Sequence, residues 1–107
     1  MNARSVPELV AGLEALVAAA RPVPLTDHVR ISRQDAHALL DELRVSAPGT
    51  HQRRPDGWDV EAVLRAVDAL DEALFAAKRI PLSDQVRVSR TDLDGYVADL
   101  RRAAPRW

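Results

Sequence analysis

Four arginines, found twice in the same setting, are the residues best suited to chemistry. The pattern V-R-[IV]-S-R contains Arg30 and Arg33 in one place and Arg87 and Arg90 in another. Guanidinium groups bind carboxylates and phosphates through paired hydrogen bonds. In each pattern we expect one arginine on the outer face of a strand and the other in the first turn of a helix. The four side chains are therefore a candidate surface for an acidic protein or a phosphate. The alternative is that they are simply solvated or paired with neighbouring acids.

The same arginines allow a second interpretation. A strand followed by a helix resembles the ribbon-helix-helix repressors, in which paired strands enter the major groove of DNA. Those repressors need a short link to a second helix, whereas more than ten residues intervene here. A net charge of −1 also weakens DNA binding, because phosphate contacts supply most of the affinity. We therefore expect nucleic acid not to be the partner, and a nucleic-acid-binding transcriptional regulator is the alternative function.

Other groups offer little for catalysis. The three histidines, His28, His37 and His51, include no pair with the i, i+4 spacing of a helical zinc site. Asp27 and Asp84 could do acid–base work if they faced each other, but aspartate in a turn ordinarily bonds nearby backbone amides. Phosphate-binding, serine-hydrolase and zinc-protease motifs do not occur. We predict that the chain is not an enzyme and has no catalytic, cofactor-binding or metal-binding residue.

Two tryptophans follow stretches that contain proline and basic residues. Packing is the usual role for Trp58 and Trp107. An exposed Trp107 could instead anchor a partner, because tryptophan is enriched at the energetic centres of interfaces. The candidate partner-binding residues are thus Arg30, Arg33, Arg87, Arg90 and Trp107.

An internal repeat must position these residues. The segment 24–48, PLTDHVRISRQDAHALLDELRVSAP, recurs 57 positions later as PLSDQVRVSRTDLDGYVADLRRAAP, with about half of the positions identical. A half of roughly 50 residues is near the lower limit for an independent core. We therefore predict a single domain, 1–107, with repeat 1 at 1–48, a linker at 49–58 and repeat 2 at 59–107.

Each repeat is predicted to be a helix, a β-hairpin and a second helix. Apolar residues recur at three- and four-residue spacing in the helices, and the predicted N-caps are Ser5, Ser32, Asp59 and Ser89. The expected fold class is α+β and mainly helical, with an approximate two-fold axis relating the repeats. We expect the two hairpins to form one four-stranded antiparallel sheet whose apolar face is covered by helices.

Alternation sets the expected hairpin register. Pairing Leu25 with Val29 and Val23 with Ile31 would put four apolar residues on one face. The turn would then lie at Thr26-Asp27-His28, with Pro24 on an edge strand.

The repeats also differ in side-chain size. Phe75 stands where repeat 1 has Ala18, and Tyr96 stands where it has Leu39. We expect such unequal pairs in one asymmetric core, where large side chains meet small ones.

Composition narrows the class of protein. Hydrophobic residues at 47% and charged residues at 29% are typical of a globular domain. The lack of cysteine excludes disulfides, zinc fingers and thiol catalysis. Residues 9–20 are similar to a signal-peptide core, but Glu14 interrupts them and Arg21-Pro22 follows. We expect a cytoplasmic protein without a transmembrane segment.

A family resemblance adds to this interpretation. The unit A-x-x-[IV]-P-L-[ST]-D-x-V-x-[IV]-x-R-x-[DE] is present as AAKRIPLSDQVRVSRTD and is followed by a helix that ends in L-R-x-x-x-P. It resembles the N-terminal module of bacterial DivIVA-like, cell-division-initiation-type coiled-coil proteins, over Val63–Pro105 and more loosely over Val6–Pro48. This sequence differs from that family in having two modules and no heptad-bearing tail.

The resemblance implies non-enzymatic self-association or scaffolding near the division site or envelope. We therefore predict a protein–protein interaction module whose partner is another protein, with a homo-oligomer as one form. Two modules in one chain would be an intramolecular version of a dimer, and joining them raises their effective concentration to roughly millimolar.

Overall fold

The computed structural model describes residues 5–47 and 59–104. The first half contains α1 (Val6–Ala18), β1 (Arg21–Pro22), β2 (His28–Ser32) and α2 (Arg33–Ser46). The second half contains α3 (Val60–Ala76), β3 (Lys78–Arg79), β4 (Gln85–Ser89) and α4 (Arg90–Ala103). The fold is α+β and mainly helical, as predicted.

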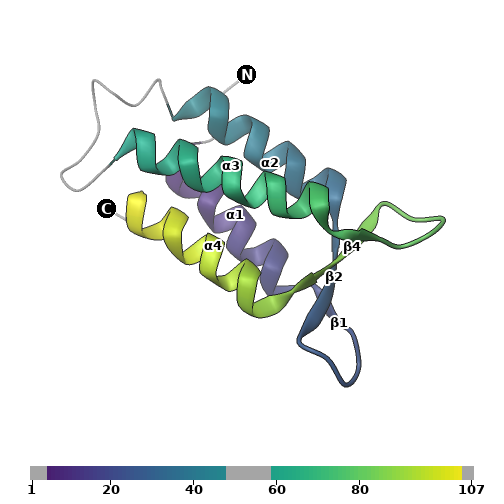
Figure 1. The fold of residues 1–107 in the computed structure, drawn as a ribbon. Helices are drawn as coiled ribbons and strands as arrows, with labels where there is room; N and C mark the ends of the chain where they lie inside the picture. Colours follow the sequence, from purple (N-terminus) through teal and green to yellow (C-terminus); the bar gives the residue numbers. More distant parts are fainter. Residues whose placement is uncertain (1–4, 48–58, 105–107) are drawn as a thin grey trace.

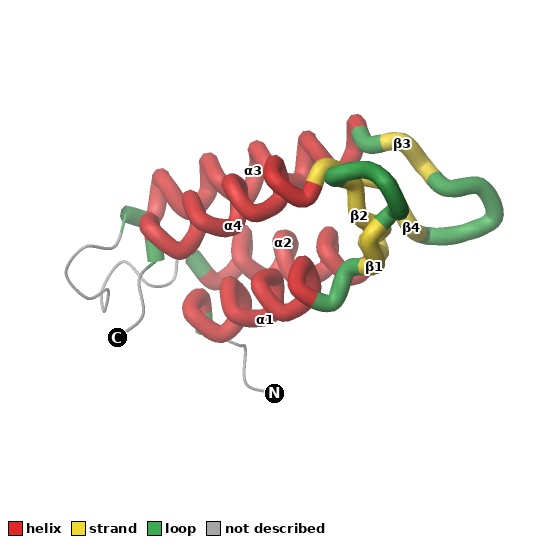
Figure 2. The backbone as a smooth tube through the Cα atoms, turned by 90° about the horizontal axis from the view of Figure 1, so that it is seen from below, coloured by secondary structure: helices red, strands yellow, loops and turns green. Residues whose placement is uncertain are grey.

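The helices form a bundle, and the strands lie together at one end of it (Figure 1). Helix α1 contacts α2 and α4, and α3 contacts the same two helices, so each helix has two helical neighbours. Figure 2 shows the two hairpins projecting from the strand end of the bundle. No helix in the described ranges is both long and apolar enough to span a membrane.

Local capping explains where the helices begin. The Ser5 hydroxyl accepts a hydrogen bond from the backbone N–H of Glu8 at 3.3 Å and donates one to the Glu8 carboxylate at 2.9 Å. This reciprocal arrangement satisfies a backbone donor that the first turn of a helix leaves free. The other predicted N-caps are also confirmed, at Ser32, Asp59 and Ser89.

The two hairpins join into one antiparallel sheet with the strand order β1-β2-β4-β3. The central strands β2 and β4 belong to different halves, and Arg30 lies directly opposite Arg87. These two arginines are also equivalent positions of the repeat, 57 residues apart. The approximate two-fold axis therefore passes between them, and the prediction of a four-stranded sheet is confirmed.

The predicted register within each hairpin is wrong. Val29 pairs with Pro22, not with Leu25, and Val23 lies outside the strands. The edge strand is thus shorter and begins earlier than expected. The inner face still carries the central-strand residues Val29 and Ile31, both of which are buried.

A tight turn explains this difference. The N–H of Thr26 donates to the carbonyl of Val23 at 3.3 Å, with Pro24 and Leu25 between them. Leu25 has a φ of 64°, so the geometry matches a type II turn, in which proline favours the second position and the third needs positive φ. Leu82 repeats this conformation with a φ of 63°.

The halves share one hydrophobic cluster, drawn from all four helices and both central strands. Its largest fully buried side chains are leucines: Leu9, Leu13, Leu40, Leu43, Leu70, Leu74, Leu93 and Leu100. The expectation that Phe75 fills this core is wrong, because its side chain is 70% exposed. Tyr96 packs against the cluster while remaining partly exposed.

Candidate interaction surface

A row of four basic residues crosses the outer face of the sheet. Arg21 lies opposite Arg30, Arg30 opposite Arg87, and Arg87 opposite Lys78. Directly opposed residues of antiparallel strands project from the same face. Val29, Ile31, Val86 and Val88 of the central strands are buried on the inner face. Because side chains alternate between the two faces of a strand, the basic side chains project outward. We call Arg21, Arg30, Arg87 and Lys78 the cationic row.

No acid of the described chain balances the cationic row. Within residues 5–47 and 59–104, none of its four side chains forms an ion pair with a carboxylate. Like charges directly opposite one another destabilise a sheet. The row is therefore a feature that the fold tolerates and does not use for stability.

A histidine lies beside the centre of the row. His28, expected in the turn, is instead the first residue of β2. Nε of Arg87 donates a hydrogen bond to its Nδ1 at 2.7 Å. Nδ1 accepts this hydrogen bond through the lone pair of the ring nitrogen. Arg87 is thereby oriented without losing its charge.

Two leucines mark the tips of the hairpins. Leu25 and Leu82 are the third residues of their type II turns, and both side chains are fully exposed to solvent. Glycine is the usual residue at such a position, because a Cβ group makes positive φ cost roughly 1–2 kcal/mol. A bulky apolar side chain there lowers stability and buries nothing within the chain. The repeat nevertheless carries it twice.

The other two predicted contact arginines lie elsewhere. The guanidinium carbon of Arg33 lies over the ring of Phe75, 4.9 Å from the ring centroid. Arg90 donates from Nη2 to the carbonyl of Val17 at 3.4 Å. Both are partly buried against a helix of the opposite half. The structure thus brings Arg30 and Arg87 together on the sheet and separates Arg33 and Arg90 from them. Trp107 lies outside the described residues.

The turn aspartates act across the halves, not within their own turns. Asp27 accepts hydrogen bonds from the Ser89 hydroxyl at 2.5 Å and from the N–H of Thr91 at 3.3 Å. Its own carbonyl accepts from the N–H of Arg90 at 2.8 Å. The first turn of α4 is therefore capped by the hairpin of the first half.

The reciprocal contact is also present. Asp84 accepts hydrogen bonds from the Ser32 hydroxyl and, at 3.2 Å, from the N–H of Gln34. Its carbonyl accepts from the N–H of Arg33 at 3.1 Å. The interpretation that these aspartates bond backbone amides holds, but the amides belong to the other repeat. The turns themselves are closed by hydroxyls, as where the N–H of His28 donates to Oγ1 of Thr26 at 3.0 Å.

These contacts lower the pKa of Asp27. The hydrogen bond from the Ser89 hydroxyl, followed by those of Thr91, holds the pKa of Asp27 below its ordinary value of 3.8. The ionised carboxylate is the better acceptor, so the helix N-terminus favours it. Asp27 therefore serves as a fixed anion that caps a helix, which leaves acid–base catalysis without support at this position.

Two ion pairs at equivalent positions also bridge the halves. Nη2 of Arg44 lies 2.7 Å from the carboxylate of Asp71, joining α2 to α3. Arg101 pairs with Glu14 and joins α4 to α1. Burial opposes ionisation of Asp71, but hydrogen bonds from Arg44 and His37 outweigh it and lower its pKa below 3.8.

Comparison with known proteins adds no relative. No family model, curated protein or solved structure matches this chain. The described residues contain no group of three or more histidine, aspartate or glutamate side chains arranged to hold a metal ion. The resemblance to DivIVA-like modules therefore stays a prediction based on the sequence.

Sequence reasoning missed four residues of this surface. Arg21 and Lys78 were not singled out, although they too are separated by 57 positions. The tip leucines were placed on the inner face because V-P-L reads as alternation. A closer look at proline followed by one residue and then Thr or Ser would have indicated a type II turn.

Proposed function

We propose that this chain is a non-enzymatic interaction module that binds an acidic surface of another protein with the outer face of its sheet. The cationic row supplies charge complementarity, and Leu25 and Leu82 insert into apolar pockets of the partner. The observation that carries this proposal is the pair of fully exposed leucines held at positive φ. They reduce the stability of the free chain, so a role in binding accounts for them better than a role in folding.

The chemistry of the partner follows from the two kinds of residue. Four basic side chains that form no ion pair with a described carboxylate favour carboxylate groups of a partner, and interfaces gain association rate and specificity from such complementarity. Each leucine that becomes buried contributes roughly 1.5–3 kcal/mol. Because the two leucines are related by the approximate two-fold axis, a partner with two equivalent pockets, such as a homodimer, fits best.

Nucleic acid is the weaker alternative. The antiparallel pair β2–β4 with outward arginines is the feature that favours it. However, β1 and β3 flank this pair. Four strands at about 4.8 Å spacing span about 14 Å, whereas the major groove is about 12 Å wide and admits two strands. The exposed tip leucines also have no role in phosphate contact.

The resemblance to DivIVA-like modules supports a cellular process and location for this function. It suggests a scaffold acting in bacterial cell division or in envelope processes, from the cytoplasmic side. The intramolecular pairing of two modules would then replace association between two chains.

The test is affinity capture from the native host followed by binding measurements with the purified partner. We expect Leu25→Asn/Leu82→Asn and Arg30→Glu/Arg87→Glu to weaken binding at least tenfold each. Val45→Asn is the matched control, since Val45 is also an exposed apolar residue, with 79% exposure, but lies on α2 away from the sheet. It should leave the dissociation constant unchanged.

Three outcomes would overturn the proposal. One is a partner whose affinity survives both double substitutions. Another is equal weakening by the Val45→Asn control. The third is a salt-dependent shift of a 30-bp DNA duplex that Arg30→Glu/Arg87→Glu abolishes, which would favour the alternative.

A further inference from the structure

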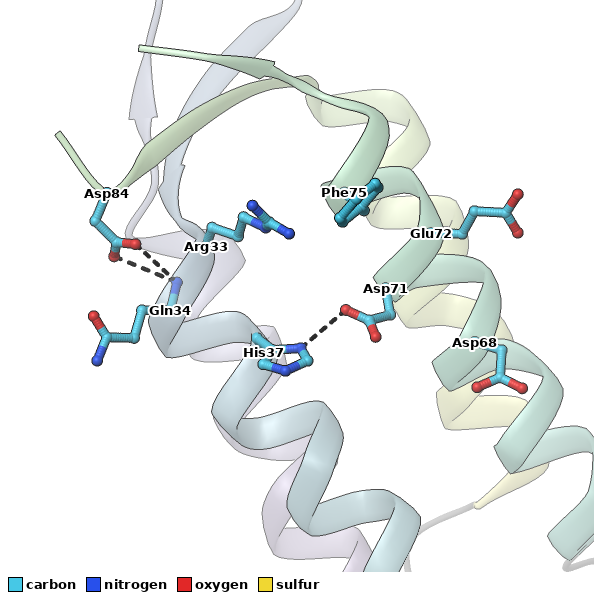
Figure 3. A pocket seen from close by; sticks show the side chains of 8 residues that line it. All are labelled: Arg33, Gln34, His37, Asp68, Asp71, Glu72, Phe75 and Asp84. Carbon is cyan, nitrogen blue, oxygen red and sulfur yellow. Dashed lines mark hydrogen bonds and ion pairs between the residues drawn. The ribbon is translucent and has the colours of Figure 1, made fainter. Parts of the chain in front are cut away.

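A groove between α2 and α3 opens beside the β3–β4 hairpin. It has a volume of about 640 Å³ and is lined by Arg33, Gln34, His37, Asp68, Asp71, Glu72, Phe75 and Asp84. Figure 3 shows the side chains of α2 and α3 facing each other across this space, with Phe75 and Asp71 on the α3 side. The groove is separate from the cationic row.

The two-fold axis places an equivalent groove between α1 and α4. This second groove is smaller, with a volume of about 280 Å³. Its lining includes Ala18, Glu14 and Asp94, which occupy the repeat positions of Phe75, Asp71 and His37. The two grooves therefore share a framework and differ in their side chains.

The difference is concentrated on one helix. Asp68, Glu72 and Phe75 of α3 stand where α1 has alanine, at positions 11, 15 and 18. Helix α1 forms and packs against its neighbours with exposed alanines at those three positions. The acidic and aromatic side chains are thus not required by the fold. They give the second half a lining that the first half lacks.

The acids of the groove fall into two groups. Asp71 is bound to Arg44 and His37, and Asp84 caps α2. By contrast, Glu72 forms no hydrogen bond or ion pair with any described residue, and the Asp68 side chain is 71% exposed while it shares Arg44. Two carboxylates can therefore receive a cationic group from outside.

Phe75 supplies the apolar part of the lining. Arg33 lies over its ring at 4.9 Å, yet the side chain remains 70% exposed. Phenylalanine is among the aromatic residues that are enriched at protein interfaces, and here it lies exposed beside acids on the lining of a groove. The aliphatic part of an arginine or lysine side chain can also pack on such a ring while its charged end reaches a carboxylate.

We propose that this groove binds a basic peptide segment of a partner protein, with an apolar side chain on Phe75 and cationic side chains on Asp68 and Glu72. Charge complementarity selects this occupant: four carboxylates and one arginine line the groove, and Asp68 and Glu72 are the two carboxylates open to a cation from outside. The cationic row needs the opposite charge in its partner. The two surfaces therefore bind different ligands and can be tested separately.

The experiment is a titration of the ¹⁵N-labelled chain with a hexapeptide of alternating leucine and arginine, followed by NMR. We expect amide shifts around residues 33–37 and 68–75, with smaller changes around residues 11–18 and 90–94. A hexapeptide of alternating leucine and glutamate is the control and should leave the groove unperturbed. The smaller groove between α1 and α4 provides a second control within the same sample.

The triple variant Asp68→Ala/Glu72→Ala/Phe75→Ala converts the groove to the residues of the first half. We expect it to fold, because α1 carries alanine at all three positions, and to bind the basic peptide at least tenfold more weakly. Glu72→Lys alone, an exposed single change, should weaken binding at least threefold and guards against loss of folding in the triple variant. Arg30→Glu/Arg87→Glu should leave this affinity unchanged even if it abolishes binding of an acidic partner.

Three results would overturn the proposal. They are equal shifts in both grooves, equal affinity for the acidic peptide, and undiminished binding by the triple variant and by Glu72→Lys. Failure of the acidic-partner test would not affect the groove, because the two experiments use different residues and opposite probe charges.

Discussion

The two halves of the chain share most of the contacts that join them, but they differ on one outward helix face. The N-cap serines, the turn aspartates, the tip leucines and the bridging ion pairs all occur twice at equivalent positions. The outward side of α3 has no such agreement with α1, since Asp68, Glu72 and Phe75 replace alanines. Most of the shared features thus lie at contacts between the halves, whereas the groove lining differs between them.

The most severe way to test this comparison is to separate the halves. Residues 1–48 and 59–107, expressed alone, should each lose most of their helical signal, because each exposes its side of the shared core and loses the aspartate cap that the other half supplies. Mixing the two pieces should restore the circular dichroism spectrum. Stable, folded monomers of either piece would show that the halves do not depend on each other.

Truncation of a core side chain should cost the same stability at equivalent positions of the two halves. Leu43 and Leu100 are both fully buried and 57 positions apart. Leu43→Ala and Leu100→Ala should each lower the free energy of unfolding by about 3 kcal/mol, as measured by urea denaturation. A difference of more than about half that cost between the two variants would mean that the core is less symmetric than its residues suggest.

Removal of the N-cap serines is expected to have the next largest effect on stability. Ser32→Ala and Ser89→Ala each remove the hydroxyl that caps its own helix and donates to an aspartate of the other half. We expect each to lower the free energy of unfolding by about 1–2 kcal/mol. Gln34→Ala, an exposed position in the first turn of α2 whose backbone N–H is kept, is a control from the same helix and should cost less. Equal losses in all three variants would remove the argument for special caps.

The tip leucines should change stability in the opposite direction. Leu25→Asn and Leu82→Asn should each raise the free energy of unfolding by about 1 kcal/mol, because asparagine adopts positive φ more easily. Chemical denaturation of the single variants measures this gain. A loss of stability in both would indicate that the leucines have a structural role in the free chain.

The pH dependence of the Asp71 ion pair is the smallest effect on stability that we expect. The pKa of Asp71 is lowered in the folded chain, so its contribution is present above about pH 4 and disappears as the pH falls through the folded pKa, which lies below 3.8. Asp71→Asn should cost roughly 0.5 kcal/mol near neutral pH, a modest value because Arg44 is one-third exposed. The gap between variant and wild type should close between pH 4 and pH 2 in thermal denaturation. A gap that stays constant down to pH 2 would assign the cost to lost packing instead.

Much of the fold could be predicted from the sequence, because comparing the two copies of the repeat shows where each helix and hairpin begins and ends. The serine caps and the V-R-[IV]-S strands are local signals, and the four-stranded sheet follows from duplicating one hairpin. The register was not predictable from alternation, since a leucine at the glycine position of a type II turn reads as part of a strand. Local patterns identify residues within one segment but not which segment lies opposite.

The candidate surface was predicted less completely for the same reason. Arg30 and Arg87 were identified from their pattern, but their position on the two-fold axis depends on strand pairing between halves. The partners of Asp27 and Asp84 lie more than 50 residues away. The groove was hidden because Phe75, on an apolar-looking helix, was taken as a core residue.

The exchange of caps between the halves has a consequence for how the chain folds. Neither α2 nor α4 gains its second cap until the hairpin of the other half has docked, so the two halves must reach order in the same step. Bringing such distant segments together requires closing long loops, which slows folding relative to bundles held by local contacts. We expect refolding to follow a single exponential without a half-folded intermediate, although the chain is assembled from two copies of one unit.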